Sequence, residues 1–301
     1  TSNEVIALPK LARVATLAKA LKAQGGRLAL AVDCEEGITR LARALQDAQA
    51  GDAAMDVLVE INVGQNRCGA EPGEAALVLA QAIAAQPVLR FAGLQAYHGG
   101  AQHLRSAEER KTAIEQVLKL VNRTRHEFDR AGLAIPLITG AGTGTMVNEA
   151  ASGIYGEIQP GSFLFMDADY AANQRDAAQP LFEHALYVKT QVMSLSGDHA
   201  VCDAGHKAHA IDSGLPRLHA LAPENALRFA NGGDEHGVLH PDADAGNHSG
   251  WLPALGESLW LIPGHCDPTV NLHDHLIGVR GGRLKGVVER IFTVDGRGAL
   301  T

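Results

Sequence analysis

The first 180 residues alternate short apolar runs with stretches of helical periodicity, and this alternation constrains the fold more than any other feature. The apolar runs lie at 5–8, 28–33, 57–63, 91–97, 137–139 and 155–163. Between them, apolar residues recur at the spacing of an amphipathic helix, as Leu11, Val14, Ala18 and Leu21 do. The pattern is typical of βα units arranged around a parallel sheet.

After about residue 180 the helical period disappears, and short β-rich pieces follow at 185–193, 200–203, 258–262 and 276–280. We therefore predict a (β/α) barrel domain over 1–180 and a β-rich domain over 181–301. Six strand-like runs are fewer than the eight strands of a closed barrel, and an open parallel edge would expose backbone groups. Because the sequence starts at Thr1, directly before an apolar run, we expect amino-terminal barrel strands to be missing from this chain.

The charge pattern argues against nucleic-acid or membrane partners. The net charge is −8, and Lys and Arg form no run interleaved with aromatic residues. No apolar stretch approaches the roughly 18 residues that span a bilayer. The four cysteines are far apart without a CxxC pair, which indicates reduced thiols. We predict a cytoplasmic protein whose partners are small molecules.

Side chains that could take part in catalysis or cofactor binding follow the predicted strands, where the catalytic groups of such folds lie. Arg67 and Tyr97 each lie just beyond an apolar run, and His103 follows shortly after Tyr97. Taken singly, Arg67 and Tyr97 are more often structural than catalytic. Together, the three supply a cation, an aromatic ring and a proton carrier, which an aromatic phosphate cofactor would use.

A glycine-rich loop follows the run at 137–139. Backbone N–H groups of such a loop can close around a phosphate, with help from threonine hydroxyls. The loop has neither the Walker lysine nor dinucleotide-binding spacing, which favours a monophosphate cofactor over a nucleoside triphosphate. The candidate positions are Thr139, Gly142, Thr143 and Gly144.

The segment 263–269 offers metal ligands. In an extended backbone His265 and Asp267 would share one face, with Cys266 on the other. An imidazole and a carboxylate suit Mn²⁺, Mg²⁺ or Zn²⁺. The segment 234–237 could add a ligand or a carboxylate that orients the imidazole. The alternative is that both segments are ordinary loops whose polar side chains only form hydrogen bonds.

Taken together, these residues closely resemble the D-threonine aldolase and D-serine dehydratase family of metal-activated, pyridoxal-phosphate enzymes. The motifs that carry the resemblance are, in order, Ser2-Asn3-Glu4-Val5 and the segments 63–69, 94–99, 102–103, 159–167, 203–205, 234–237 and 265–269. They span nearly the whole chain. The resemblance implies an alanine-racemase-like fold, an (α/β)₈ barrel followed by a β domain, and by analogy of fold a homodimer.

For the cofactor, the resemblance implies that Arg67 faces the pyridine nitrogen of pyridoxal 5′-phosphate, Tyr97 lies at the cofactor and residues 142–144 hold its phosphate. The family's Schiff-base lysine lies in an Arg-Pro-His-x-Lys-type motif, which this chain lacks. We expect that lysine in the missing amino-terminal part, without which the chemistry would fail. Lys207 is a poor substitute, because relatives carry a lysine there beside their normal one.

For the reaction, the resemblance implies that His265 and Asp267 bind the divalent metal, while His103 and this metal address the substrate's β-hydroxyl. The predicted activity is cleavage of a D-3-hydroxy amino acid, such as D-threonine, to glycine and an aldehyde. Dehydratase relatives have His-x-Cys at the metal, so Asp267 favours an aldolase. The segment 212–216 looks like that of 3-hydroxyaspartate aldolases. The alternatives are a dehydratase of D-serine or D-3-hydroxyaspartate, or a non-catalytic cofactor-binding protein.

Overall fold

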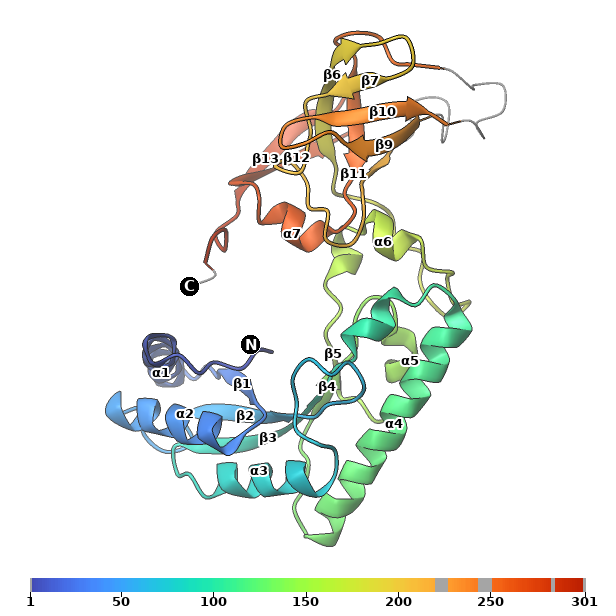
Figure 1. The fold of residues 1–301 in the computed structure, drawn as a ribbon. Coiled ribbons are helices and arrows are strands. Elements are labelled where there is room, and N and C mark those ends of the chain that lie inside the picture. The colour runs from blue at the N-terminus through green and yellow to red at the C-terminus, as the bar shows by residue number, and fades with distance from the viewer. Residues whose placement is uncertain (1, 220–226, 243–250, 283–284, 300–301) are drawn as a thin grey trace. The chain divides into compact units, whose positions relative to one another are not determined.

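The computed structural model describes residues 2–219, 227–242, 251–282 and 285–299 (Figure 1). The chain forms two compact units. The first unit comprises Thr1–Gly161 and Asn173–Gln179, and the second comprises Ser162–Ala172 and Pro180–Thr301. Each unit has its own hydrophobic core, so each is described by itself.

The first unit contains a parallel sheet of five strands in the order β1-β2-β3-β4-β5. The strands are β1 (Ala29–Val32), β2 (Met55–Glu60), β3 (Leu89–Ala96), β4 (Ile138–Gly140) and β5 (Glu157–Ile158). Every residue of β2 is buried, as expected for a parallel strand covered on both faces. The predicted arrangement of βα units around a parallel sheet is therefore confirmed.

Helices connect these strands and bury apolar stripes against the sheet. They are α1 (Leu8–Ala23), α2 (Glu35–Asp47), α3 (Glu74–Ala84), η1 (Gly99–His103), α4 (Ala107–Arg130) and α5 (Met146–Ala151). Helix α4 begins with a capping box, in which the Ser106 hydroxyl accepts from the Glu109 N–H and the Ser106 N–H donates to the Glu109 carboxylate. This cap fixes where the connection from β3 ends.

The prediction of a strand at 5–8 is wrong. Helix α1 starts at Leu8, with Ala7 as its N-cap and Pro9 in its first turn. Proline is well tolerated there, because its missing N–H is one of the donors that a helix start leaves unpaired in any case. The run at 155–163 is also less regular than a full strand, since only Glu157–Ile158 pair with β4.

The second unit is β-rich, as predicted. Its main sheet has six strands in the order β8-β11-β6-β7-β10-β9, all of whose described pairings are antiparallel. They are β6 (Val188–Leu195), β7 (Ala200–Cys202), β8 (Arg217–Leu218), β9 (Leu227–Asn231), β10 (Gly237–Pro241) and β11 (Ser258–Ile262). A separate hairpin joins β12 (His275–Arg280) and β13 (Val287–Thr293), and the short helices are η2 (Ser162–Leu164), α6 (Ala168–Ala171) and α7 (Cys266–Val270).

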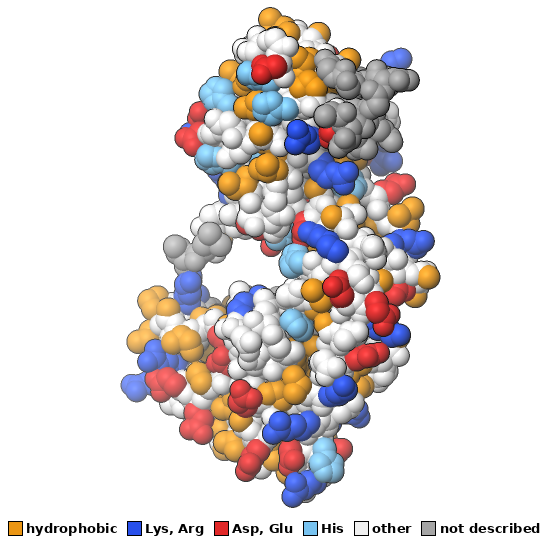
Figure 2. Space-filling model, turned by 45° about the vertical axis from the view of Figure 1, so that its right-hand side comes forward, with side chains coloured by type: hydrophobic (Ala, Val, Ile, Leu, Met, Phe, Trp, Pro, Cys, Tyr) orange, Lys and Arg blue, Asp and Glu red, His pale blue; other side chains and the backbone are white. Residues whose placement is uncertain are grey.

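Two surface properties bear on the predicted partners. None of the helices in the described part of the chain has the length and apolar character needed to cross a membrane. On the face shown in Figure 2, Lys and Arg side chains alternate with Asp and Glu, so the described residues on that face form no continuous basic patch.

Candidate active site

Arg67 and Tyr97 meet at the carboxyl ends of neighbouring strands. Arg67 follows β2, Tyr97 follows β3, and the guanidinium carbon lies 5.7 Å from the centre of the phenol ring. Burial raises the pKa of the Tyr97 hydroxyl, the Arg67 cation opposes this rise, and Glu149 adds to it. The structure thus brings together an exposed cation and a half-buried ring, as the positions of both residues after strands predicted.

His103 is the last residue of η1, in the segment that follows β3 and Tyr97. Its side chain is exposed, whereas that of the preceding Gln102 is completely buried. This turn therefore has one side chain facing outward and one packed into the unit. The role of His103 stays a prediction.

The glycine loop at the end of β4 is buried throughout. The Thr139 hydroxyl donates to Glu157 Oε1 (2.6 Å) and accepts from Gln159 Nε2 (2.8 Å). The N–H of Gly144 donates to Gln102 Oε1 (3.0 Å), so one of the groups predicted to reach a phosphate already has a partner within the protein. The phosphate role of the loop, including Gly142 and Thr143, stays a prediction.

In the second unit His265 is the N-cap of helix α7, and Asp267 lies in the helix's first turn. The segment 263–269 is thus not extended throughout, and the argument from alternating side chains is wrong for Asp267. Asp and Pro are both favoured in a first helical turn, because the carboxylate complements the helix dipole and proline needs no N–H partner there. Whether His265 and Asp267 bind a metal stays a prediction.

Asp212 orients the His265 imidazole. Nδ1 of His265 lies 2.8 Å from Asp212 Oδ2 and 3.3 Å from Ser213 Oγ. A ring nitrogen held by a carboxylate in this way leaves Nε2 as the atom available to a metal. Sequence reasoning missed this role, because Asp212 and His265 are 53 positions apart and nothing in either segment indicates the pairing.

The sequence offered the segment 234–237 for that orienting role, but the structure pairs it elsewhere. Asp234 Oδ1 lies 2.8 Å from Nε2 of His206, and Glu235 Oε1 accepts from the Lys207 ammonium at 2.6 Å. The carboxylates of Glu235 and Asp234, which both lie beside the Lys207 ammonium, raise the pKa of Lys207. Lys207 is therefore a charged residue paired with carboxylates at the surface of the second unit.

Asp167 anchors the segment that carries His265. Its carboxylate is fully buried and accepts from two backbone N–H groups, those of Tyr170 (2.9 Å) and Cys266 (3.0 Å). It thereby caps α6 and the start of α7 at once. An aspartate directly before a short helical stretch is an N-cap signal, but the second cap could not have been found from the sequence.

Cys266 is buried against this anchor. Burial raises the pKa of its thiol to about 11, despite a hydrogen bond with Ser162 that lowers it. The thiol is therefore protonated at neutral pH in the protein without metal, where it packs as a small buried side chain.

Another group of possible ligands occurs among the described residues, where ligand atoms of Glu4, Asp33 and Cys68 lie within 4.8 Å of one another. Burial, followed by the nearby carboxylates of Glu4, Glu60 and Asp33, raises the pKa of the Cys68 thiol. This group lies in the first unit and contains no imidazole, so it differs from the predicted ligand set of His265 and Asp267.

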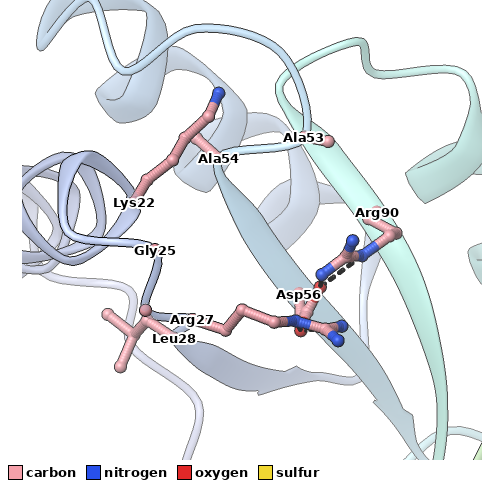
Figure 3. Close-up of a pocket in the computed structure, with 9 residues that line it drawn as sticks. Lys22, Gly25, Arg27, Leu28, Ala53, Ala54, Asp56 and Arg90 are labelled. Carbon is pink, nitrogen blue, oxygen red and sulfur yellow. Dashed lines mark hydrogen bonds and ion pairs between the residues drawn. The ribbon is translucent and has the colours of Figure 1, made fainter.

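A pocket of about 240 Å³ lies at the opposite, amino-terminal end of the strands (Figure 3). Asp56 is one of the lining residues, and its Oδ2 accepts from Nε of Arg27 (2.7 Å) while its Oδ1 accepts from Nε of Arg90 (2.6 Å). The ammonium of Lys22, another lining residue, donates to the carbonyl of Asp52. Because each of these cations already has an oxygen partner, the pocket is a structural charge cluster rather than a candidate site.

A parallel βα unit with its polar residues at the strand exits, followed in the chain by an antiparallel β unit, defines the alanine-racemase-like class of fold. Residues 3–169 match the family model described as "Alanine racemase, N-terminal domain". Residues 185–279 match the "Putative serine dehydratase domain".

Individual relatives narrow this class. A D-threonine aldolase of Arthrobacter sp is 42% identical over 99% of this chain and 73% of its own length. A 3-hydroxy-D-aspartate aldolase of Paracoccus denitrificans (strain Pd 1222) is 38% identical with the same coverage. The crystal structure of D-threonine aldolase from Filomicrobium marinum is 42% identical with a TM-score of 0.89, over 100% of this chain and 78% of that one. The chain therefore belongs to the family of D-threonine aldolase and 3-hydroxy-D-aspartate aldolase, which confirms the predicted family and fold class.

Proposed function

We propose that the protein is an aldolase, dependent on pyridoxal 5′-phosphate and a divalent metal, that cleaves D-3-hydroxy amino acids to glycine and an aldehyde. The observation that carries the proposal is identity of 42% and 38% to two aldolases over 99% of the chain. When bound, the cofactor supplies an electron sink for charge at Cα, and the metal supplies a Lewis acid for the hydroxyl.

The first unit has groups that fit the cofactor. Arg67 would face the pyridine nitrogen with a cation, which keeps that nitrogen unprotonated, and Tyr97 would lie beside the ring. Residues 142–144 would bind the phosphate, with Thr139 at the base of the loop. The support is the Arg67–Tyr97 contact of 5.7 Å and a loop whose glycines admit no Cβ without a shift of Gln102. His103, exposed on the adjoining turn, would accept the proton of the substrate hydroxyl.

The second unit has groups that fit a metal. Asp212 holds Nδ1 of His265, which leaves Nε2 for a cation, and Asp267 would add a carboxylate oxygen. A nitrogen and oxygen set without thiolate suits Mn²⁺, Mg²⁺ or Zn²⁺. By analogy of fold, we also propose that the protein acts as a homodimer.

A dehydratase is the second candidate, because residues 185–279 match a putative serine dehydratase domain. The two reactions differ in their products. An aldolase yields glycine and an aldehyde, whereas a dehydratase yields a keto acid and ammonia.

The test uses the full-length gene product with D-threonine, D-3-hydroxyaspartate and D-serine, with products identified by mass spectrometry. We expect glycine and aldehyde from one or both of the first two substrates. Treatment with EDTA should abolish turnover, and added Mn²⁺ should restore it. Keto acid with ammonia, or a rate that EDTA leaves unchanged, would contradict the proposal.

A further inference from the structure

The Gln102 side chain forms hydrogen bonds to the glycine loop through both its amide oxygen and its amide nitrogen. Oε1 accepts from the Gly144 N–H (3.0 Å), and Nε2 donates to the Thr145 hydroxyl (2.8 Å) and to the His98 carbonyl (3.2 Å). Gln102 is completely buried and directly precedes His103. One amide therefore connects the loop after β4 to the turn after β3.

Gln102 also explains why the loop contains glycine at two positions. A Cβ on Gly142 would lie 2.5 Å from Gln102 Oε1, and a Cβ on Gly144 would lie 2.6 Å from the Gln102 carbonyl oxygen. Both distances are far below van der Waals contact. The loop is thus in close contact with both the side chain and the backbone of Gln102, so neither the loop nor the turn can shift without moving the other.

The segment Asn173–Gln179 of the first unit also connects the glycine loop to the turn after β3. Asn173 Nδ2 donates to the Gln102 carbonyl (2.8 Å), and Gln179 Nε2 donates to the Thr143 carbonyl (3.1 Å). Asn173 is held in turn by Arg105, whose guanidinium donates to its side-chain oxygen (2.7 Å). The turn and the loop therefore share two independent sets of hydrogen bonds.

The hydrogen-bond chain continues from Gln102 into the core. The Thr145 hydroxyl, which accepts from Gln102, donates to Glu149 Oε1 (2.8 Å), and Glu149 Oε2 is buried without a partner. Burial raises the pKa of this carboxyl to about 7, although the bond from Thr145 opposes the rise. The Thr145 hydroxyl gives its one hydrogen to Glu149 and must accept from Gln102, which fixes the orientation of the Gln102 amide.

We propose that Gln102 is a positioning residue, whose amide sets the distance between the glycine loop and the turn that carries His103. The inference rests on the proposed function, in which the loop binds the cofactor phosphate and His103 moves the substrate's proton. Gln102 itself touches neither the substrate nor the cofactor in this scheme. It links binding at the phosphate to the placement of the base.

The test compares Gln102→Met, which keeps the length of the side chain and removes its hydrogen bonds, with the control Thr124→Val. Thr124, in helix α4, is a matched control because its buried hydroxyl also accepts from a glycine N–H, that of Gly73 (2.9 Å). Dissociation constants of pyridoxal 5′-phosphate and of pyridoxal, which lacks the phosphate, are measured on the full-length protein. Their ratio reports on the phosphate site alone.

We expect Gln102→Met to weaken pyridoxal 5′-phosphate binding about tenfold, as the loss of the two hydrogen bonds to Gly144 and Thr145 implies, and to leave pyridoxal binding unchanged. At saturating cofactor, kcat should fall at least about tenfold with little change in KM, since a displaced base impairs the chemical step. Thr124→Val should lower the melting temperature without changing the ratio.

Thr145→Val serves as a second variant if Gln102→Met fails to fold, and it should shift the ratio in the same direction by a smaller factor. An unchanged ratio in the variant that folds, or an equal change in Thr124→Val, would overturn the role of Gln102. If the unmodified protein does not bind pyridoxal 5′-phosphate more tightly than pyridoxal, the proposed function fails as well. The two failures are therefore distinguishable.

Discussion

Replacing Asp212 by asparagine removes the negative charge that faces Nδ1 of His265 and keeps the volume of the side chain. Burial tends to raise the pKa of Asp212, but hydrogen bonds from His265 and Ser213 outweigh it and the pKa is lowered. The group is therefore a carboxylate at neutral pH. A neutral amide holds the imidazole less firmly and makes Nε2 a weaker base toward a metal.

The size of the effect follows from exposure. Loss of a partner of this kind costs about 10- to 100-fold in metal affinity. The Asp212 side chain is 49% exposed and that of His265 23% exposed, so water screens part of their interaction. We therefore expect the lower end, about tenfold weaker Mn²⁺ binding, which corresponds to about 1.4 kcal/mol.

Isothermal titration of the metal-free protein with Mn²⁺ measures this change. Asp198→Asn is the control, because Asp198 also lies beside an imidazole nitrogen, that of His199 at 2.7 Å, but away from the predicted ligands in sequence. We expect the control to bind Mn²⁺ as the unmodified protein does. Equal affinity for Asp212→Asn and the unmodified protein, or equal losses in both variants, would refute the assignment of His265 as a ligand oriented by Asp212.

Two further predictions concern buried carboxyl groups. Asp167→Ala should destabilise the protein by about 3 kcal/mol in urea unfolding, because the N–H groups of Tyr170 and Cys266 lose their acceptor. It should also weaken Mn²⁺ binding. An unaltered unfolding transition would contradict the double cap. The pKa of Glu149 is about 7 in the folded protein against an ordinary 4.5, so the folded state keeps its proton longer and stability should fall between these pH values, then level off above about 7. Glu149→Gln should abolish this loss of roughly 3 kcal/mol, as unfolding at pH 5 and pH 8 would show, and an unchanged pH dependence would count against it.

The spacing of apolar residues along the sequence predicted most of the helices and strands of the first unit. The stripe Leu11, Val14, Ala18 and Leu21 lies within α1, and the parallel strands have the apolar runs of doubly covered strands. The start of α1 was misjudged because a four-residue apolar run is compatible with either a strand or the approach to a helix. Pro9, in the first turn, is the residue that favours the helix.

The candidate site was only partly predictable. Placement of Arg67 and Tyr97 after adjacent parallel strands follows from the fold, because the carboxyl ends of such strands share one edge of the sheet. The residues that orient others depend on long-range packing. Gln102 lies 42 positions from Gly144 in sequence, and Asp212 lies 53 positions from His265, so no local pattern reveals either pairing.

The double cap made by Asp167 has a consequence for where the second unit tolerates changes in loop length. The hydrogen bond from the Cys266 N–H to Asp167 joins two residues that lie 99 positions apart. The chain between them therefore begins and ends at the same place in the second unit, and we call it the excursion. Connections within that excursion can lengthen or shorten at small entropic cost without displacing the residues beyond its end. The connection that carries Asp212 is the exception, because a change in its length would move the carboxylate that holds the His265 imidazole.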